Sequence, residues 1–249
     1  MGKTVEAMKG WVAQPRWAPL RLLPDLLAGV GLLLAGLAWL VSVGLLTLAI
    51  AAGSVLAYGV LAVLLLGRWS APRSGFGWPN RVTLLRALPV CVLAGALAQP
   101  ELYRDHGTLL AALAGAALLL DGLDGWLARR LDAATAFGAR FDMELDAALI
   151  LVLCLGLALS GKVEVWVLAI GLMRYAFVAA GYRVPRLRRP LPDSTRRKAV
   201  CVWQVLALLA CLPGFVTAAT ATWLAASALL ALTVSFALDV RWLLRQRAG

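Results

Sequence analysis

The chain has 249 residues, 62% of which are hydrophobic, and its mean hydropathy is +0.84. This composition excludes a soluble domain and predicts an all-α polytopic membrane protein, because few polar residues interrupt the apolar stretches as they would in a β-barrel. The formal net charge is +11, and the basic residues lie in short segments between apolar stretches. We therefore attribute this charge to membrane topology and anionic lipid head groups, and we expect no nucleic-acid partner.

The first quarter of the chain is predicted to hold an interfacial segment and a helical hairpin. Residues 1–25 combine tryptophans and basic residues with three prolines that break any long helix. This mixture is typical of a segment at a cytoplasmic membrane surface, and a flexible tail is the alternative. Residues 26–67 are almost uncharged and long enough for two spans of about 20 residues each. We expect an additional transmembrane hairpin here, with its turn between Gly44 and Ser54.

Residues 78–240 hold the six remaining predicted helices, and residues 241–249 form a basic cytoplasmic tail. The expected helices are 79–99, 108–130, 139–159, 165–182, 199–216 and 218–238, with a short loop from Gln99 to Gly107. With the hairpin, this gives about eight transmembrane helices. Four cysteines fall within apolar stretches and are expected to be small buried core residues: Cys91, Cys154, Cys201 and Cys211.

An acidic segment between Asp121 and Asp146 holds six of the chain's 13 acidic residues. Asp121 and Asp124 are three residues apart, so they share one face of a helix. Asp142 and Asp146 are four apart and also share one face. Residues 130–137 can form a turn between two antiparallel helices, so we expect the four carboxylates to converge.

Four unpaired carboxylates would repel one another strongly in a low-dielectric site. Oxygen ligands favour a hard cation, Mg²⁺ or Mn²⁺, and two such ions suit phosphoryl transfer. The alternative is a set of structural ion pairs with the neighbouring basic residues Arg129, Arg130 and Arg140. Glu144 lies off the face of the two aspartates of its helix and is expected to meet a basic residue.

The acidic segment resembles the signature of the CDP-alcohol phosphatidyltransferase family at every position. The matching pattern is Asp121-x-x-Asp124-Gly125-x-x-Ala128-Arg129, then eight residues, then Gly138-x-x-x-Asp142-x-x-x-Asp146. The segment Pro79-Asn80-x-x-Thr83-x-x-Arg86 is similar to the opening of the family's first core helix. The resemblance covers roughly residues 78–240. It implies a six-helix core, to which the hairpin is an addition, and a homodimer.

The resemblance also implies a reaction and the roles of the site residues. A phosphatidyl group would move from a CDP-linked lipid, CDP-diacylglycerol, to a small alcohol, with release of CMP. One divalent ion would be held by Asp121, Asp124 and Asp142, and a second by Asp121, Asp142 and Asp146. Asp146 would act as general base for the acceptor hydroxyl. The expected nucleotide-binding residues are Asn80, Thr83, Asp124, Gly125, Ala128, Arg129 and Gly138; for Asn80, a plain helix cap is the alternative.

The acceptor side is predicted to be basic. Arg174 lies within the predicted helix 165–182, where an arginine usually faces a polar cavity or a carboxylate; a side chain that snorkels to the membrane surface is the alternative. Four residues have spacings similar to those of the phosphatidylglycerophosphate synthase branch: Arg174, Arg183, Ser194 and Lys198. That branch usually has Gly, Lys and Thr at three positions where this chain has Arg197, Val200 and Cys201. A basic pocket favours a phosphorylated acceptor, glycerol 3-phosphate first, while serine, inositol phosphate and choline stay open.

Charge asymmetry predicts the orientation in the membrane. Eight helices place both termini on one side, and only Arg104 and Lys162 of the 24 basic residues then lie on the other side. We therefore expect a multi-pass protein of the inner (cytoplasmic) membrane with both termini and the active site facing the cytoplasm. The other functions considered are a divalent-cation transporter that uses the carboxylates as a filter and a catalytically inert scaffold.

Overall fold

The computed structural model describes residues 21–68, 76–130, 135–189, 191–192 and 194–245, and for residues 123–130 and 188 it describes the backbone alone. The interfacial segment predicted before Arg21 and the end of the basic tail after Arg245 lie outside this part of the chain. The described residues form nine α-helices and no strand. The helices are α2 (Leu23–Ser42), α3 (Leu48–Arg68), α4 (Trp78–Gly95), α5 (Glu101–Asp105), α6 (Gly107–Arg130), α7 (Ala136–Leu159), α8 (Leu168–Arg183), α9 (Thr195–Cys211) and α10 (Ala218–Arg245). Three short 3₁₀ helices join them: η3 (Ala96–Ala98), η4 (Val165–Val167) and η5 (Pro185–Arg188).

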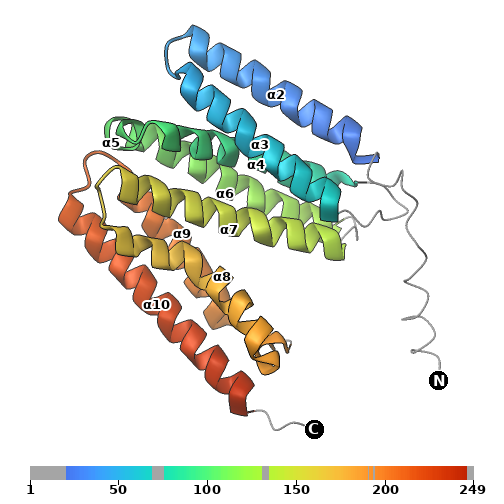
Figure 1. Ribbon diagram of the computed structural model, residues 1–249, viewed down its shortest axis with the longest axis vertical. Helices are drawn as coiled ribbons and strands as arrows, with labels where there is room; N and C mark the ends of the chain where they lie inside the picture. Colours follow the sequence, from blue (N-terminus) through green and yellow to red (C-terminus); the bar gives the residue numbers. More distant parts are fainter. Residues whose placement is uncertain (1–20, 69–75, 131–134, 190, 193, 246–249) are drawn as a thin grey trace.

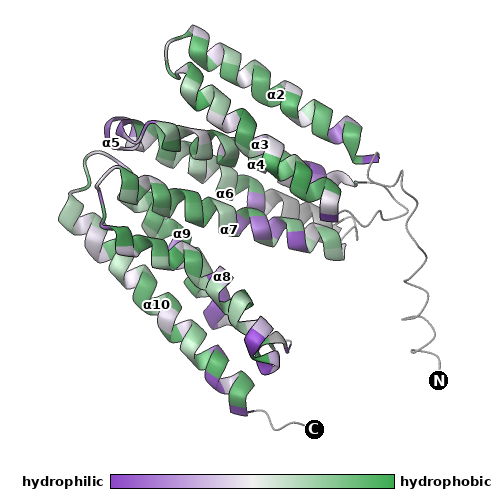
Figure 2. Ribbon diagram, viewed as in Figure 1, coloured by the Kyte–Doolittle hydropathy of each residue, from purple (hydrophilic) through white to green (hydrophobic). Residues whose placement is uncertain are grey.

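The long helices confirm the prediction of an all-α polytopic membrane protein. Within the described residues, five segments are long and apolar enough to cross a membrane: α2, α3, α4 with η3, η4 with α8, and α10. In α6 the apolar part is Gly107–Gly122, and the acidic segment follows it. Many large hydrophobic side chains of these helices are exposed, and Figure 2 shows that hydrophilic residues gather towards the helix ends. A surface of this kind is expected of helices that face lipid.

The hairpin is present, but its turn is shorter than predicted. Gly44 has a φ of 73°, and the turn closes with a hydrogen bond from the Leu45 amide to the Leu40 carbonyl. Ser54, which was expected in the turn, lies inside α3 instead, where its hydroxyl donates to the Ile50 carbonyl at 2.8 Å. Gly53 and Ser54 are packing residues, because a Cβ on Gly53 would lie 3.0 Å from the Cα of Gly95 in α4 and a Cβ on Gly95 would collide with Ser54. Small side chains allow two membrane helices to approach closely, so they do not by themselves indicate a turn.

Helix α4 lies in the middle of the molecule. It packs against α3, α6 and α7, and also contacts α2, while α8, α9 and α10 form the other side of the bundle (Figure 1). The hairpin is further tied to the bundle by an ion pair of 2.7 Å between Asp25 in α2 and Arg81 in α4. The segments that carry the predicted site, at the start of α4, the end of α6 and the start of α7, therefore meet at one end of the bundle.

The opposite end of the bundle carries the two basic residues that the sequence placed apart from the others. Arg104 donates to the Ser160 carbonyl at 2.9 Å, and Lys162 donates to the Pro213 carbonyl at 2.7 Å. Both cations thus bind backbone oxygens close to where α7 and α9 end, as the negative end of a helix dipole favours. The predicted loop from Gln99 to Gly107 also lies here, and it contains the short helix α5, which the sequence analysis missed.

Candidate active site

Three of the four predicted carboxylates converge at the polar end of the bundle. Asp121 comes from α6, and Asp142 and Asp146 come from α7. One oxygen from each lies within 4.8 Å of the others. Their side chains are between 34% and 38% exposed. The structure therefore confirms that these three carboxylates meet, while the side chain of Asp124 lies outside the part of the chain that is described.

Local sequence explains this convergence. Asp142 and Asp146 are one helical turn apart, so they project from one face of α7. Helix α7 begins after Thr135, whose Oγ1 accepts a hydrogen bond of 3.0 Å from the Gly138 amide and so caps the helix. Helix α6 ends at Arg130 and α7 begins at Ala136, and both pack against α4, which carries the arginine that the three carboxylates share.

The cation that binds the three carboxylates is Arg86 of α4. Its Nη1 donates to Asp121 at 2.5 Å and to Asp142 at 2.7 Å, and its Nη2 donates to Asp146. Only 2% of its side chain is exposed. Arg86 belongs to the sequence pattern that resembles the family's first core helix, but the pattern alone assigned it no role. The available signal was an arginine inside an apolar span, three residues after Thr83 and so on the same helix face.

The alternative partners of the carboxylates do not take this place. Arg140 is exposed and forms no ion pair with any described residue. The side chains of Arg129 and Arg130 lie outside the described part, as do those of Gly125 and Ala128. Structural ion pairing of the cluster therefore involves a residue on a third helix, far from the acidic segment in the sequence.

The donor set fits a hard divalent cation. Asp121, Asp142 and Asp146 offer carboxylate oxygens alone, the ligands that Mg²⁺ and Mn²⁺ prefer. Three carboxylates and one guanidinium together carry a net charge of −2, which a divalent ion would neutralise. The guanidinium also demonstrates that a cation can contact all three carboxylates at once.

Two of the predicted nucleotide-binding residues, Asn80 and Gly138, are in contact. A Cβ on Gly138 would lie 2.5 Å from Oδ1 of Asn80, so only glycine permits this approach. Asn80 and Thr83 are 5% and 3% exposed, and each donates to a backbone carbonyl four residues earlier in the chain. The helix-cap interpretation of Asn80 is wrong, because α4 begins after Gly77 and has no side-chain cap. Asn80 lies inside the helix and faces the start of α7.

The basic residues predicted on the acceptor side differ in their surroundings. Arg174 of α8 forms an ion pair of 2.8 Å with Glu144 of α7, which confirms that Glu144 meets a basic residue and that Arg174 faces a carboxylate. The Nε of Arg174 is buried and has no hydrogen-bond partner. Arg183, at the end of α8, and Lys198, in the first turn of α9, are exposed. Ser194 precedes α9, and its side chain makes no cap hydrogen bond.

One face of α9 is turned towards the carboxylates. Ser194, Lys198 and Cys201 follow one another at intervals of four and three, so they share a face. The Cys201 thiol interacts electrostatically with the carboxylates of Asp121 and Asp146. Cys201 is exposed, so its prediction as a buried core residue is wrong, whereas the other three cysteines are buried as expected. An apolar stretch does not reveal which of its faces borders a polar hollow.

Arg196 and Arg197, in the first turn of α9, hold this helix against α10 and do not contact the carboxylates of the site. Arg196 donates to the Ser235 carbonyl at 2.6 Å, to the Ser235 hydroxyl at 2.9 Å and to the Asp239 carboxylate. Arg197 lies 3.6 Å from the same carboxylate, whose side chain is 12% exposed. Arg196 and Arg197 therefore serve helix packing, in contrast to the exposed Arg183 and Lys198.

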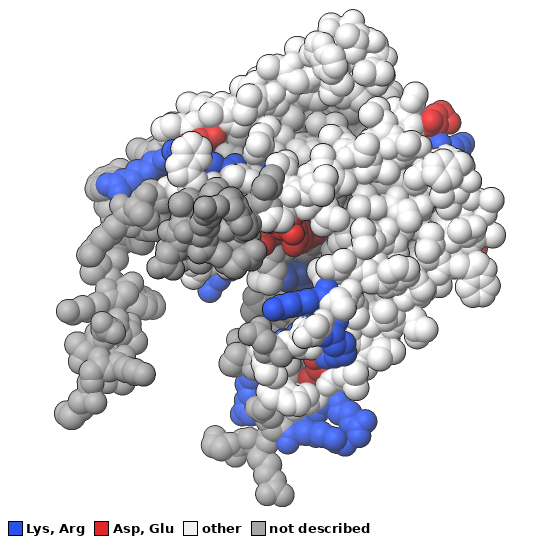
Figure 3. Space-filling model, turned by 180° about the vertical axis from the view of Figure 1, so that it is seen from behind, with Lys and Arg blue, Asp and Glu red and all other residues white. Residues whose placement is uncertain are grey.

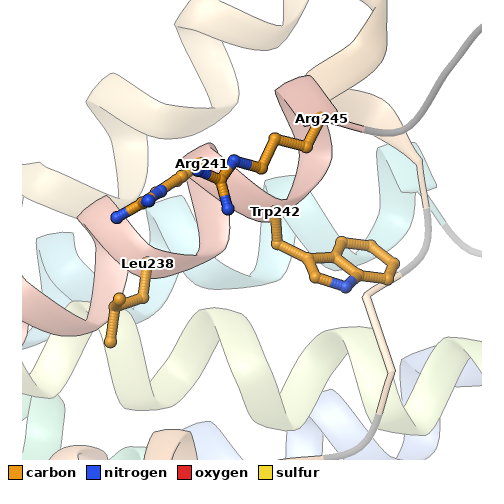
Figure 4. A pocket seen from close by; sticks show the side chains of 4 residues that line it. All are labelled: Leu238, Arg241, Trp242 and Arg245. Atoms are coloured by element: carbon orange, nitrogen blue, oxygen red, sulfur yellow. The ribbon is translucent and has the colours of Figure 1, made fainter.

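The carboxylate site and a basic hollow at the end of α10 are two different places on the molecule. Figure 3 shows acidic side chains in a recess near the middle of one face, with a group of basic side chains below it. At the end of α10, a shallow hollow of about 620 Å³ is lined by Leu238, Arg241, Trp242 and Arg245 (Figure 4). The described residues that line this second hollow are basic or apolar.

The comparison with known families extends over most of this architecture. The family model for CDP-alcohol phosphatidyltransferases matches residues 76–238, a range that contains Arg86 and the three carboxylates and leaves α2 and α3 outside. The search of solved structures found no match. Because the family model covers well over half of the chain, and three acidic residues of the signature converge in the structure, the chain belongs to the CDP-alcohol phosphatidyltransferase family.

Proposed function

We propose that this transferase moves a phosphatidyl group from CDP-diacylglycerol to the hydroxyl group of glycerol 3-phosphate and releases CMP. The observation that carries the proposal is the convergence of Asp121, Asp142 and Asp146 in a recess beside basic side chains. Bound Mg²⁺ or Mn²⁺ ions, two by the family pattern, would polarise the diphosphate and stabilise the charge that develops on CMP. Asp124 would complete the ligand set.

In the proposed reaction, the acceptor oxygen attacks the phosphorus that carries the diacylglycerol. A new phosphorus–oxygen bond forms to the acceptor, and the bond from that phosphorus to the bridging oxygen breaks, so that CMP leaves with the electron pair. Asp146 accepts the proton of the acceptor hydroxyl as general base. Its carboxylate is 37% exposed, so a hydroxyl group can reach it from the recess.

The nucleotide would lie beside the start of α4. The contact between Asn80 and Gly138 would form one wall of this region, and Thr83 follows three residues after Asn80 on the same side of the helix. By the resemblance, Asp124, Gly125, Ala128 and Arg129 of α6 supply the opposite wall. Positioning of the two substrates in one recess supplies much of the rate in a reaction of this kind.

The acceptor assignment is supported by the cations near the recess. Helix α9 packs against α6 and α7, which carry the carboxylates, and Arg174 of α8 pairs with Glu144 of α7. Arg183, Ser194 and Lys198 would extend this basic side of the recess. Cationic side chains favour a phosphorylated alcohol, whereas choline carries no anionic group and the single carboxylate of serine is accompanied by an ammonium group.

We also propose a homodimer in the inner membrane, with both termini and the recess on the cytoplasmic side. The sidedness is supported by Arg104 and Lys162, which lie together at the end of the bundle opposite the recess. The division into a core of residues 78–240 and an added hairpin of residues 26–67 follows the range that the family model matches.

The test is release of CMP by the purified protein. The assay would contain Mn²⁺ or Mg²⁺, CDP-diacylglycerol and one radiolabelled alcohol at a time: glycerol 3-phosphate, serine, inositol phosphate or choline. We expect incorporation of glycerol 3-phosphate, and loss of it in D146N. The matched control is D25N, an aspartate-to-asparagine change in the hairpin, which should stay active. Activity in D146N would refute the base assignment, incorporation of another alcohol alone would refute the acceptor, and no release with any of them would refute the function.

A further inference from the structure

Arg86 and the carboxylates that it binds differ in their access to solvent. The guanidinium reaches the cluster from α4 with 2% of its side chain exposed, whereas the three carboxylates keep more than a third of their side chains exposed. Arg86 therefore lies beneath the cluster, and the recess lies on the other side. A divalent ion that enters from the recess meets carboxylates that already hold a cation.

The bonds of Arg86 extend across both helices of the acidic segment. Nη1 contacts Asp121 of α6 and Asp142 of α7, and Nη2 contacts Asp146 of α7. A planar guanidinium with five donors can make such a set of bonds, whereas a lysine offers a single point charge. A buried arginine in an apolar helix is tolerated only with partners of this kind, and the carboxylates in turn need a cation to offset their mutual repulsion.

We propose that Arg86 is a built-in counter-cation that competes with divalent ions for Asp121, Asp142 and Asp146. The inference rests on the proposed function, because it requires that these carboxylates bind a divalent ion. Arg86 stabilises the cluster before the ion binds, and it gives up part of its hydrogen bonds when the ion arrives. It thereby sets the affinity of the site for the ion, and the protein can fold without one.

Removal of Arg86 has two opposing effects on ion affinity. The carboxylates lose a partner that orients them, and changes of this kind typically weaken ion binding by about 10–100-fold. They also lose a positive charge in direct contact with the ligand oxygens, which repels the incoming ion. Even at an intermediate dielectric constant of about 20, the repulsion between a full positive charge and a divalent ion about 5 Å away is the larger effect. The proposal therefore predicts tighter ion binding in variants without the charge.

The experiment measures Mn²⁺ affinity, from the free-ion electron paramagnetic resonance signal, and the melting temperature with chelator and with Mn²⁺. R86M should melt at a lower temperature than wild type with chelator, bind Mn²⁺ with an affinity about tenfold or more higher, and gain more stability from Mn²⁺. R86Q provides a second neutral variant in case R86M does not fold. R86K keeps the charge but not the set of bonds, and it should bind Mn²⁺ no more tightly than wild type.

A control variant and the possible contrary results distinguish a failure of this inference from a failure of the proposed function. R81M removes an exposed arginine on the same helix, which pairs with Asp25, and should leave Mn²⁺ affinity unchanged. Unchanged affinity in R86M and R86Q would indicate a purely structural role, and weaker affinity would indicate orientation of the ligands; either result overturns the proposal. Absence of Mn²⁺ binding by the wild type would overturn both this inference and the proposed function.

Discussion

Substitution of Gly138 by alanine tests the packing that brings α4 against the start of α7. The new Cβ would lie 2.5 Å from Oδ1 of Asn80 and 3.1 Å from Oγ1 of Thr135, and carbon atoms do not approach oxygen atoms below 3.0 Å. Asn80 is 5% exposed and donates to the Phe76 carbonyl, so it cannot swing into solvent. Either this hydrogen bond breaks or the two helices separate.

The expected cost can be estimated from these contacts. Overpacking of a filled interior costs about 1–3 kcal/mol, and a lost buried hydrogen bond adds about 1 kcal/mol. The higher helix propensity of alanine returns up to about 1 kcal/mol in a helix interior and less in the first turn, where Gly138 lies. We therefore expect G138A to lower the free energy of unfolding by about 1–3 kcal/mol. CDP-diacylglycerol binding should weaken as well.

The assay is unfolding in detergent, followed by loss of helical signal. The matched control is G115A in α6, where a Cβ would meet nothing within 4 Å, and its stability should be unchanged or slightly higher. The N80A/G138A double variant isolates the contact, because alanine at position 80 removes the oxygen that the new Cβ meets. The two substitutions should therefore be coupled by about 0.5–3 kcal/mol. Strictly additive effects would refute the argument that Asn80 and Gly138 are in contact.

Two further predictions concern single side chains around the recess. Cys201 is the one exposed cysteine of four, so a maleimide should label one thiol in the native protein, not label C201A, and react more slowly when Mn²⁺ and CDP-diacylglycerol are present; labelling of a second thiol would contradict the burial of the other three. The two ion pairs on this side should differ in strength, because Asp239 is 12% exposed and binds Arg196, whereas Glu144 is 46% exposed and binds Arg174. D239N should lower the free energy of unfolding by about 1–3 kcal/mol and E144Q by less than about 1 kcal/mol, so equal losses in the same unfolding assay would be inconsistent with the structure.

The sequence predicts the helices well because a membrane leaves the backbone few choices. Apolar stretches of the right length have to form helices, since the backbone groups have no other partners in lipid. Helix periodicity also places Asp142 and Asp146 on one face. The error in the hairpin arose because small residues, such as Ser54, occur both in turns and at close helix contacts.

The parts of the site that the sequence did not reveal depend on tertiary packing. Spacing along one helix cannot identify which side chain of another helix completes a cluster, and so Arg86 was not assigned to the carboxylates. The environment of Cys201 was wrongly predicted because the residues of one apolar helix can face the lipid, the protein core or a polar recess. The sequence predicted that Glu144 meets a basic residue, because it lies off the face of the two aspartates, but it did not identify Arg174 as that residue.

The packing of the hairpin has a consequence for the route by which a lipid substrate arrives. Helices α2 and α3 cover the side of α4 that faces away from α6 and α7. A two-tailed lipid keeps its acyl chains in the bilayer while its head group reaches the carboxylates, and it cannot pass through this covered flank. We therefore expect the lipid to enter from the opposite side, next to α8 and α9. A bulky side chain placed there would obstruct the lipid donor and leave the water-soluble acceptor free to enter.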